Sequence, residues 1–208
     1  PTLDGLRRHL FRDLGFQGDR RTYYDPANSL LPSVLRRRRG IPISLSVLCM
    51  TVGARIGVPL DGVGMPSHFL LRDRVDPTVF VDAFDNGAVL DAVGCEGLWR
   101  SITASDRAFD PAWLEPVGPE EILARMLANL SSIYRAHGDH GALVWVHELR
   151  AAIPGIGPTE LIELGAALVG AGQLGRAAAA FDLAAGRLDG ELAARCRRSA
   201  AHLRARLN

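Results

Sequence analysis

Two side chains in the first half of the chain, His68 and Asp82, are of the types that act together as a base and its orienting carboxylate. They lie in two short apolar runs, Ser67 to Asp73 and Thr78 to Phe84, on either side of the turn sequence RVDP. This pattern predicts a β-hairpin. With the turn centred near Val75, the two residues oppose each other on one face, with Cβ atoms about 5 Å apart. A carboxylate in that place fixes the imidazole tautomer, so the pair is expected to mark a functional site.

The apolar run from Gly40 to Met50, GIPISLSVLCM, predicts a buried helix before the hairpin. Pro42 suits the first helical turn because its φ is fixed and it needs no N–H partner there. The only charged residue between positions 43 and 56 is Arg55, and Gly57 then ends the helix. The N-terminus of a helix stabilises negative charge, so an anionic nucleophile would be stabilised there.

Three side chains on this helix are of nucleophilic types. Ser46 lies one turn from Pro42 on the same face, about 6 Å along the axis, and is a candidate nucleophile. The alternative is a packed core hydroxyl that bonds a backbone carbonyl. Ser44 lies near the positive end of the helix, where capping the first turn is the alternative role. Cys49 lies two turns inside an apolar helix, where burial keeps a thiol inert.

Two further polar residues are candidates for ligand binding. Asn28 follows an Asp-Pro turn, so it either lines the cleft or caps the next helix. Arg72 follows His68 on the same expected strand and could bind an acidic group, although a solvated strand end is the alternative.

Composition limits the partners. The 24 basic residues, all arginine, nearly balance 23 acidic ones, so the net charge of +1 predicts neither a nucleic-acid nor a membrane partner. The arginine run at positions 36–39 fits the negative end of a helix instead. Without lysine, Schiff-base catalysis by a side-chain amine is excluded.

The cysteines and histidines predict no cofactor. Three widely separated cysteines have neither disulfide nor zinc spacing, and His137, His140 and His147 have no carboxylate or cysteine that completes a metal set. With no run of about 20 apolar residues, we expect a cytoplasmic protein.

The composition changes near residue 115. Upstream lie most prolines and β-branched runs, whereas the sequence downstream is rich in alanine and leucine and predicts successive helices. We therefore expect one domain over residues 1–115 and a helical domain over residues 116–208. In the second, small and large residues follow a tetratricopeptide-like pattern, with Gly165 on one helix and Phe181 on the next. Such helices bury their apolar faces on their neighbours.

Several short motifs occur in one order along the first domain. They are Asn28-Ser29, the GIPISLS that starts at Gly40, Gly57-Val-Pro, Pro66-x-His-Phe-Leu-x-Arg72 and Asp82-x-Phe-x-x-Gly87. Together they resemble the transglutaminase-like superfamily, and within it the bacterial SirB-type proteins, in which such a domain precedes tetratricopeptide-like helices. The resemblance covers nearly the whole chain.

The resemblance implies an α/β (α+β) papain-like domain with a Cys-His-Asp triad, followed by an all-α helical module. His68 and Asp82 match the histidine and the aspartate. The cysteine position, counted back from Gly57-Val-Pro, falls on Pro42, which has no reactive group.

Three functions follow as expectations. The first is a catalytically degenerate protein with a regulatory role, which binds a peptide, protein or small-molecule ligand in the cleft near His68 and a protein partner on the helical repeats. The second is a hydrolase or acyltransferase that acts on amide or ester bonds, using His68 and Asp82 with Ser44, Ser46 or an activated water. The third is a purely structural domain, which predicts a closed cleft.

Overall fold

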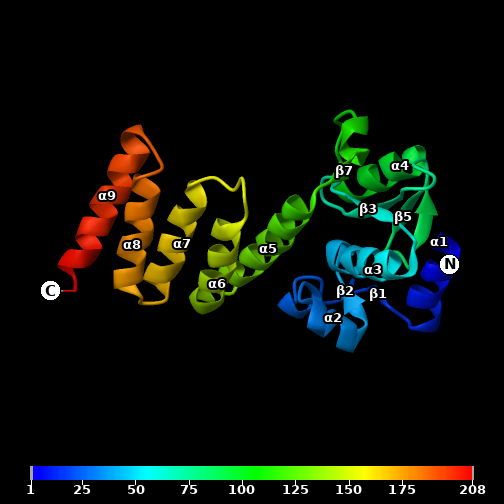
Figure 1. The fold of residues 1–208 in the computed structure, drawn as a ribbon, viewed down its shortest axis with the longest axis horizontal. Helices are drawn as coiled ribbons and strands as arrows, with labels where there is room; N and C mark the ends of the chain where they lie inside the picture. Colours follow the sequence, from blue (N-terminus) through cyan, green and yellow to red (C-terminus); the bar gives the residue numbers. More distant parts are fainter. Residues whose placement is uncertain (1, 208) are drawn as a thin grey trace. The chain divides into compact units, whose positions relative to one another are not determined.

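The computed structural model describes residues 2–207 and divides the chain into two compact units, one up to Ile122 and one from Leu123 onward (Figure 1). The first unit is a mixed α/β structure around a five-stranded sheet, and the second is made of helices. Within the described residues, no helix has the length and apolar character needed to cross a bilayer.

The sheet of the first unit is antiparallel throughout, with the strand order β6-β5-β4-β3-β7. Its strands are β3 (Leu60–Val63), β4 (Leu70–Asp73), β5 (Phe80–Asp82), β6 (Ala88–Leu90) and β7 (Pro116–Val117). Two short segments, β1 (Gln17–Gly18) and β2 (Arg39–Gly40), pair with each other in parallel as a separate two-stranded sheet.

Alternate residues of the central strands enter different cores. Leu71 and Val81 pack with Leu45 and Cys49 of α3 (Pro42–Ile56). Their neighbours Leu70 and Phe80 belong to a second core, which also includes Cys95 and Trp99 of α4 (Ala92–Thr103). Because successive side chains on a strand point to opposite faces, the sheet lies between α3 and α4.

Helix α3 begins and ends where the sequence predicts. Pro42 occupies its first turn, and Gly57 ends it in the left-handed conformation with φ of 75°. Only a residue without a Cβ adopts this φ at little cost, which explains the sharp stop.

Two further helices of the first unit are short. Helix α1 (Leu3–Arg7) passes into a wider π-helical stretch, Arg8–Asp13. Helix α2 covers Leu31–Arg37 and ends at Arg38, whose φ is 56°.

The hairpin of β4 and β5 is confirmed, but its predicted register is wrong. Leu71 pairs with Val81 and Arg72 with Phe80, so the ladder is symmetric about residue 76 rather than 75. His68 therefore lies before β4 begins and is not directly opposite Asp82. The turn between the strands decides the register, and apolar alternation alone does not fix the loop length.

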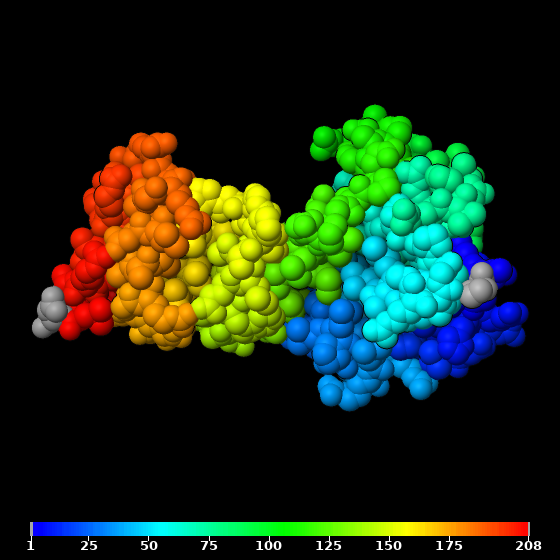
Figure 2. Space-filling view, viewed as in Figure 1, coloured from blue at the N-terminus to red at the C-terminus, as the bar shows by residue number. Residues whose placement is uncertain are grey.

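The second unit is a succession of helices that pack on their sequence neighbours. They are α5 (Pro119–Ala136, which begins in the first unit), α6 (His140–Ala152), α7 (Thr159–Gly170), α8 (Leu174–Ala185) and α9 (Gly190–Ala205). In the space-filling view, the atoms of α7, α8 and α9 form adjoining bands from yellow to red (Figure 2).

Candidate functional site

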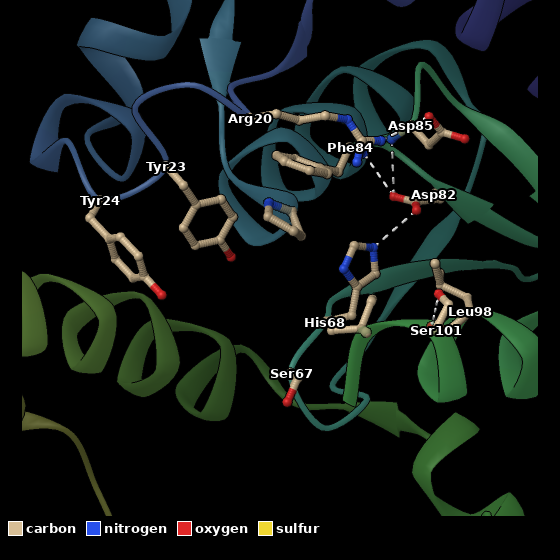
Figure 3. Close-up of a pocket in the computed structure, with 12 residues that line it drawn as sticks. Arg20, Tyr23, Tyr24, Ser67, His68, Asp82, Phe84, Asp85, Leu98 and Ser101 are labelled. Atoms are coloured by element: carbon tan, nitrogen blue, oxygen red, sulfur yellow. Dashed lines mark hydrogen bonds and ion pairs between the residues drawn. The ribbon is translucent and has the colours of Figure 1, made fainter. Parts of the chain in front are cut away.

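A pocket with a volume of about 710 Å³ opens in the first unit (Figure 3). Its walls are formed by Arg20, Tyr23, Tyr24, Pro42, Ser67, His68, Asp82, Phe84, Asp85, Leu98, Ser101 and Ile102. Loops supply seven of these twelve residues. Helix α4 supplies Leu98, Ser101 and Ile102, while β5 supplies Asp82 and the start of α3 supplies Pro42. The volume suits a small ligand or a few residues of a peptide, contrary to the closed cleft that a purely structural domain predicts.

His68 and Asp82 meet in the wall of this pocket. The distance from Nε2 of His68 to Oδ2 of Asp82 is 3.0 Å, and the two side chains are only 6% and 4% exposed. The predicted pair therefore forms, although the strands do not have the predicted register. Side chains two places out of register remain within reach across a ladder, and the imidazole spans the remaining gap.

The second oxygen of Asp82 is held by the turn that follows β5. Oδ1 accepts hydrogen bonds from the backbone N–H of Phe84 at 2.9 Å and of Asp85 at 3.3 Å. The ring of Phe84 then stands edge-on to the His68 ring, with centroids 6.2 Å apart. These contacts fix the carboxylate, so Oδ2 is presented to the imidazole.

Aromatic and charged side chains form the rest of the pocket wall. The guanidinium of Arg20 lies 5.0 Å from the centre of the Phe84 ring, and its Nη2 is 3.0 Å from Oδ1 of Asp85. Tyr23 and Tyr24 stand across the pocket from Asp82 (Figure 3). Tyr24 is 73% exposed, which is unusual for so large a ring and typical of a contact surface.

The position expected for a nucleophile is occupied by Pro42. This residue lines the same pocket as His68 and lies in the first turn of α3, where the helix end favours negative charge. Its side chain has no hydroxyl or thiol. This residue therefore offers no nucleophile at the start of α3.

The structure does not bring Ser44 or Ser46 to the pocket. Ser44 is fully buried; its hydroxyl accepts from the N–H of Ile41 at 3.0 Å and donates to the carbonyl of Asn28 at 2.6 Å. It caps the helix, which is the alternative that the sequence left open. Ser46 is also fully buried and its hydroxyl has no hydrogen-bond partner among the described residues, rather than the expected backbone carbonyl.

The buried cysteines of this unit are poor nucleophiles. Burial raises the pKa of Cys49 to about 12, against the opposing charge of Arg7. Burial, with the negative charges of Asp91 and Asp82, likewise raises the pKa of Cys95 to about 12. Neither residue lines the pocket, so thiol chemistry has no group there.

Asn28 and Arg72 also lie outside the pocket lining. The Asn28 side chain is buried and donates to the carbonyl of Thr22 at 2.7 Å. Arg72 donates through Nε to the carbonyl of Pro77 at 2.9 Å and lies 3.4 Å from a carboxylate oxygen of Glu115. Both side chains organise loops of the first unit.

Of the twelve residues that line the pocket, the sequence indicates a site role only for Pro42, His68 and Asp82. Arg20, Tyr23 and Tyr24 come from a loop with no periodic pattern, although two adjacent tyrosines before a turn were a usable signal. Ser67 precedes His68 and has φ of 65°, a conformation that costs free energy in a residue with a Cβ and that is enriched at functional sites.

Comparison with known proteins identifies the fold family. A sequence profile of the transglutaminase-like superfamily matches residues 1–128. The chain belongs to the transglutaminase-like superfamily. In this transglutaminase-like chain the His68–Asp82 pair is present, and Pro42 stands at the start of the helix that precedes it.

Its relatives include bacterial and mammalian proteins. A UPF0162 protein of Xylella fastidiosa is 43% identical over 136 residues, which cover 64% of this chain and 48% of the relative. A UPF0162 protein of Vibrio cholerae is 32% identical over 132 residues, or 62% of this chain and 48% of the relative. Human F-box only protein 21 is 37% identical over 147 residues, or 65% of this chain and 22% of that protein.

The chain thus spans about half the length of the UPF0162 relatives that it matches. No solved structure matches it significantly. Among residues 2–207, no three or more His, Cys, Asp or Glu side chains are grouped so that they could hold a metal ion.

Proposed function

We propose that this transglutaminase-like domain is a catalytically degenerate binding domain with a regulatory role. Its ligand, a peptide, a protein segment or a small molecule, occupies the pocket beside His68. The observation that carries the proposal is Pro42, which lines the pocket at the helix start where the superfamily resemblance expects a cysteine. Without a nucleophile the pair of His68 and Asp82 still offers a buried, oriented hydrogen-bonding group.

The other walls support binding. Tyr23, Tyr24 and Phe84 offer aromatic faces and edges, and Arg20 and Asp85 offer one charge of each sign. Apolar rings with a few placed polar groups are the usual composition of a site that recognises a ligand. The exposed ring of Tyr24 gives a partner an amphipathic contact at low conformational cost.

The experiment that tests binding uses peptides selected from a random display library on the full chain, with dissociation constants measured by calorimetry. We expect His68→Ala to weaken binding at least tenfold, about 1.4 kcal/mol, because the ligand loses the oriented imidazole. His9→Ala is the matched control, since this exposed histidine pairs with Asp13 away from the pocket.

Two results would reject the proposal. One is that His68→Ala and His9→Ala bind the selected peptides alike. The other is a covalent adduct on Ser44 or Ser46 after treatment with a serine-directed acyl probe, because such an adduct requires a working nucleophile in the domain.

The alternative function is hydrolysis of an amide or ester by a water that His68 activates. It is favoured by the solvent-open pocket and by the 3.0 Å approach of Asp82 to the imidazole. The buried hydroxyls of Ser44 and Ser46 lend it no support. This alternative requires that His68→Ala abolish turnover of an acyl substrate while the fold is kept.

We also infer that the chain is of the SirB type and that its helical unit is tetratricopeptide-like and binds a protein partner. Gly165 supports this inference because it packs directly against the Phe181 ring: a Cβ at this position would lie only 2.8 Å from the ring. The tetratricopeptide-like pattern requires such a small residue opposite a large one. Ala177 and Ala184 are fully buried on the adjoining helix. A reducing cytoplasm as the location is supported by three buried, unpaired cysteines.

A further inference from the structure

The helical unit brings together a serine, a histidine and a glutamate from three different helices. Nε2 of His147 on α6 lies 3.2 Å from the hydroxyl of Ser131 on α5. Its Nδ1 lies 2.5 Å from Oε1 of Glu160 on α7. All three residues are more than nine-tenths buried. The two nitrogens of one imidazole thus connect a hydroxyl to a carboxylate, as in the triads of serine hydrolases.

The charge state of Glu160 sets the direction of these hydrogen bonds. Burial alone raises its pKa, but hydrogen bonds from Arg150 and His147 outweigh that effect and lower it. The Nε of Arg150 donates to the same Oε1 at 2.9 Å. An ionised carboxylate only accepts, so Nδ1 of His147 carries the proton. Nε2 is then the acceptor for the O–H of Ser131, which is the tautomer that a general base needs.

This cluster is reached from solvent through a pocket of about 390 Å³. The pocket is lined by Ala128, Ser131, Ser132, Arg135, His147, Arg150, Glu160 and Glu163. The lining includes no Leu, Ile, Val, Met, Phe, Tyr or Trp, so the pocket suits a short acyl group and not a fatty-acid chain.

Arg135 is placed to stabilise a developing negative charge. It lies one helical turn beyond Ser131 on α5, on the same side of the helix, and it lines the same pocket. The helix interior has no unpaired backbone N–H, so the donor to an oxyanion must be a side chain. The Nη2 of Arg135 donates to Glu163 at 2.7 Å, and a guanidinium has further N–H donors to offer.

We propose that Ser131, His147 and Glu160 form a reactive site, separate from the pocket beside His68, which cleaves short-chain carboxylic esters. Oγ of Ser131 attacks the acyl carbon as its proton passes to Nε2 of His147, and Arg135 binds the oxyanion. The bond from carbon to the leaving oxygen then breaks, and His147 returns the proton so that an alcohol departs. Water, deprotonated by His147, cleaves the acyl-serine; a carboxylic acid leaves and Ser131 regains its proton.

The proposal is independent of the function assigned to the pocket of the first unit, because no residue is shared between the two sites. Its test is the site of covalent labelling in the full chain. A fluorophosphonate probe is applied to the folded protein and, separately, to protein unfolded in 8 M urea, and the modified residue is identified by peptide mass spectrometry. We expect an adduct on Ser131 in the folded protein and none in the unfolded protein.

Variants distinguish labelling of the triad serine from labelling of a reactive surface hydroxyl. Ser131→Ala abolishes labelling, whereas Ser132→Ala, the exposed neighbour in the same pocket, keeps it. His147→Gln slows labelling and hydrolysis of p-nitrophenyl acetate at least about 100-fold, because the general base is lost. Circular dichroism checks that each variant is folded.

An absent adduct at Ser131 in the folded wild-type protein overturns the proposal without reference to any variant. Equal labelling of folded and unfolded protein overturns it too, as does an unchanged rate in folded His147→Gln. In those cases the cluster only joins α5, α6 and α7. Loss of peptide binding in His68→Ala leaves these outcomes unaffected, so the two sites are judged separately.

Discussion

The imidazole Nε2 of His68 lies 3.0 Å from Oδ2 of Asp82, while Oδ1 of the same carboxylate holds the turn after β5 through Phe84. Asp82 therefore both orients the histidine and shapes the pocket wall in which Phe84 stands. Changes at the two ends of the carboxylate should have separable effects.

Asp82→Ala is expected to lower the free energy of unfolding by about 2–3 kcal/mol, because the buried turn N–H groups lose a charged acceptor. Asp82→Asn retains one oxygen for the turn and should lose only about 1 kcal/mol. Urea unfolding followed by tryptophan fluorescence measures both. Equal losses in the two variants would show that the turn does not depend on Oδ1.

Two serines on α3 provide a matched comparison. Ser44→Ala removes a hydroxyl that bonds both Ile41 and Asn28, so it should destabilise the protein by about 1–2 kcal/mol. Ser46→Ala removes a buried hydroxyl that has no hydrogen-bond partner within residues 2–207 and should change stability by less than about 0.5 kcal/mol. Thermal unfolding of both variants checks this order, and the reverse order would contradict the capping role of Ser44.

Acid should weaken the first unit through Asp19. Burial acts to raise its pKa, but hydrogen bonds from Thr22, Arg21 and Asn28 outweigh burial and lower the pKa to about 2. A carboxyl whose folded pKa is depressed stabilises the fold above its unfolded pKa, near 4, and that contribution disappears as the pH falls toward 2.

The test variant is Asp19→Asn. At pH 7 it should be about 1–2 kcal/mol less stable than the wild type, and the difference should shrink between pH 4 and pH 2. Urea titrations at pH 7, 4 and 2.5 measure it. A difference that stays constant over this range would mean that the charge of Asp19 does not stabilise the fold.

The native thiols should resist alkylation. With pKa values raised to about 12, Cys49 and Cys95 carry almost no thiolate at pH 8, and both are buried. Iodoacetamide at pH 8 should leave them unmodified in the folded protein and modify both in urea, as read by mass spectrometry. Rapid modification of either cysteine in the folded protein would contradict this prediction and show that the domain contains a reactive thiol.

The sequence predicts the local features that depend on short-range rules. Helix α3 starts at Pro42 and stops at Gly57 because proline and glycine each favour one backbone conformation. The hairpin follows from two apolar runs around a turn. The register of the hairpin does not follow from the sequence, because the number of residues in the loop between β4 and β5 depends on turn geometry. The alternation of apolar and polar residues does not determine that geometry.

Long-range packing accounts for what the sequence did not predict. Arg20 reaches the pocket only because its loop folds over Phe84, which lies 64 positions later. The sequence indicates at most a metal-ligand role for His147, because nothing in the spacing of Ser131 and Glu160 shows that three helices bring the three residues together. Pairings of this kind are set by helix packing and not by local pattern.

The central claim is that the pocket keeps the environment of a catalytic thiol and lacks only the thiol itself. Pro42→Cys tests it most directly, with the rate of iodoacetamide alkylation of the introduced thiol measured from pH 5 to pH 10. We predict a pKa below the ordinary value of about 8.5, because the helix N-terminus and His68 favour the thiolate, and a higher pKa when His68→Ala is added. An introduced thiol that titrates at about 8.5 and does not respond to His68→Ala would contradict the account.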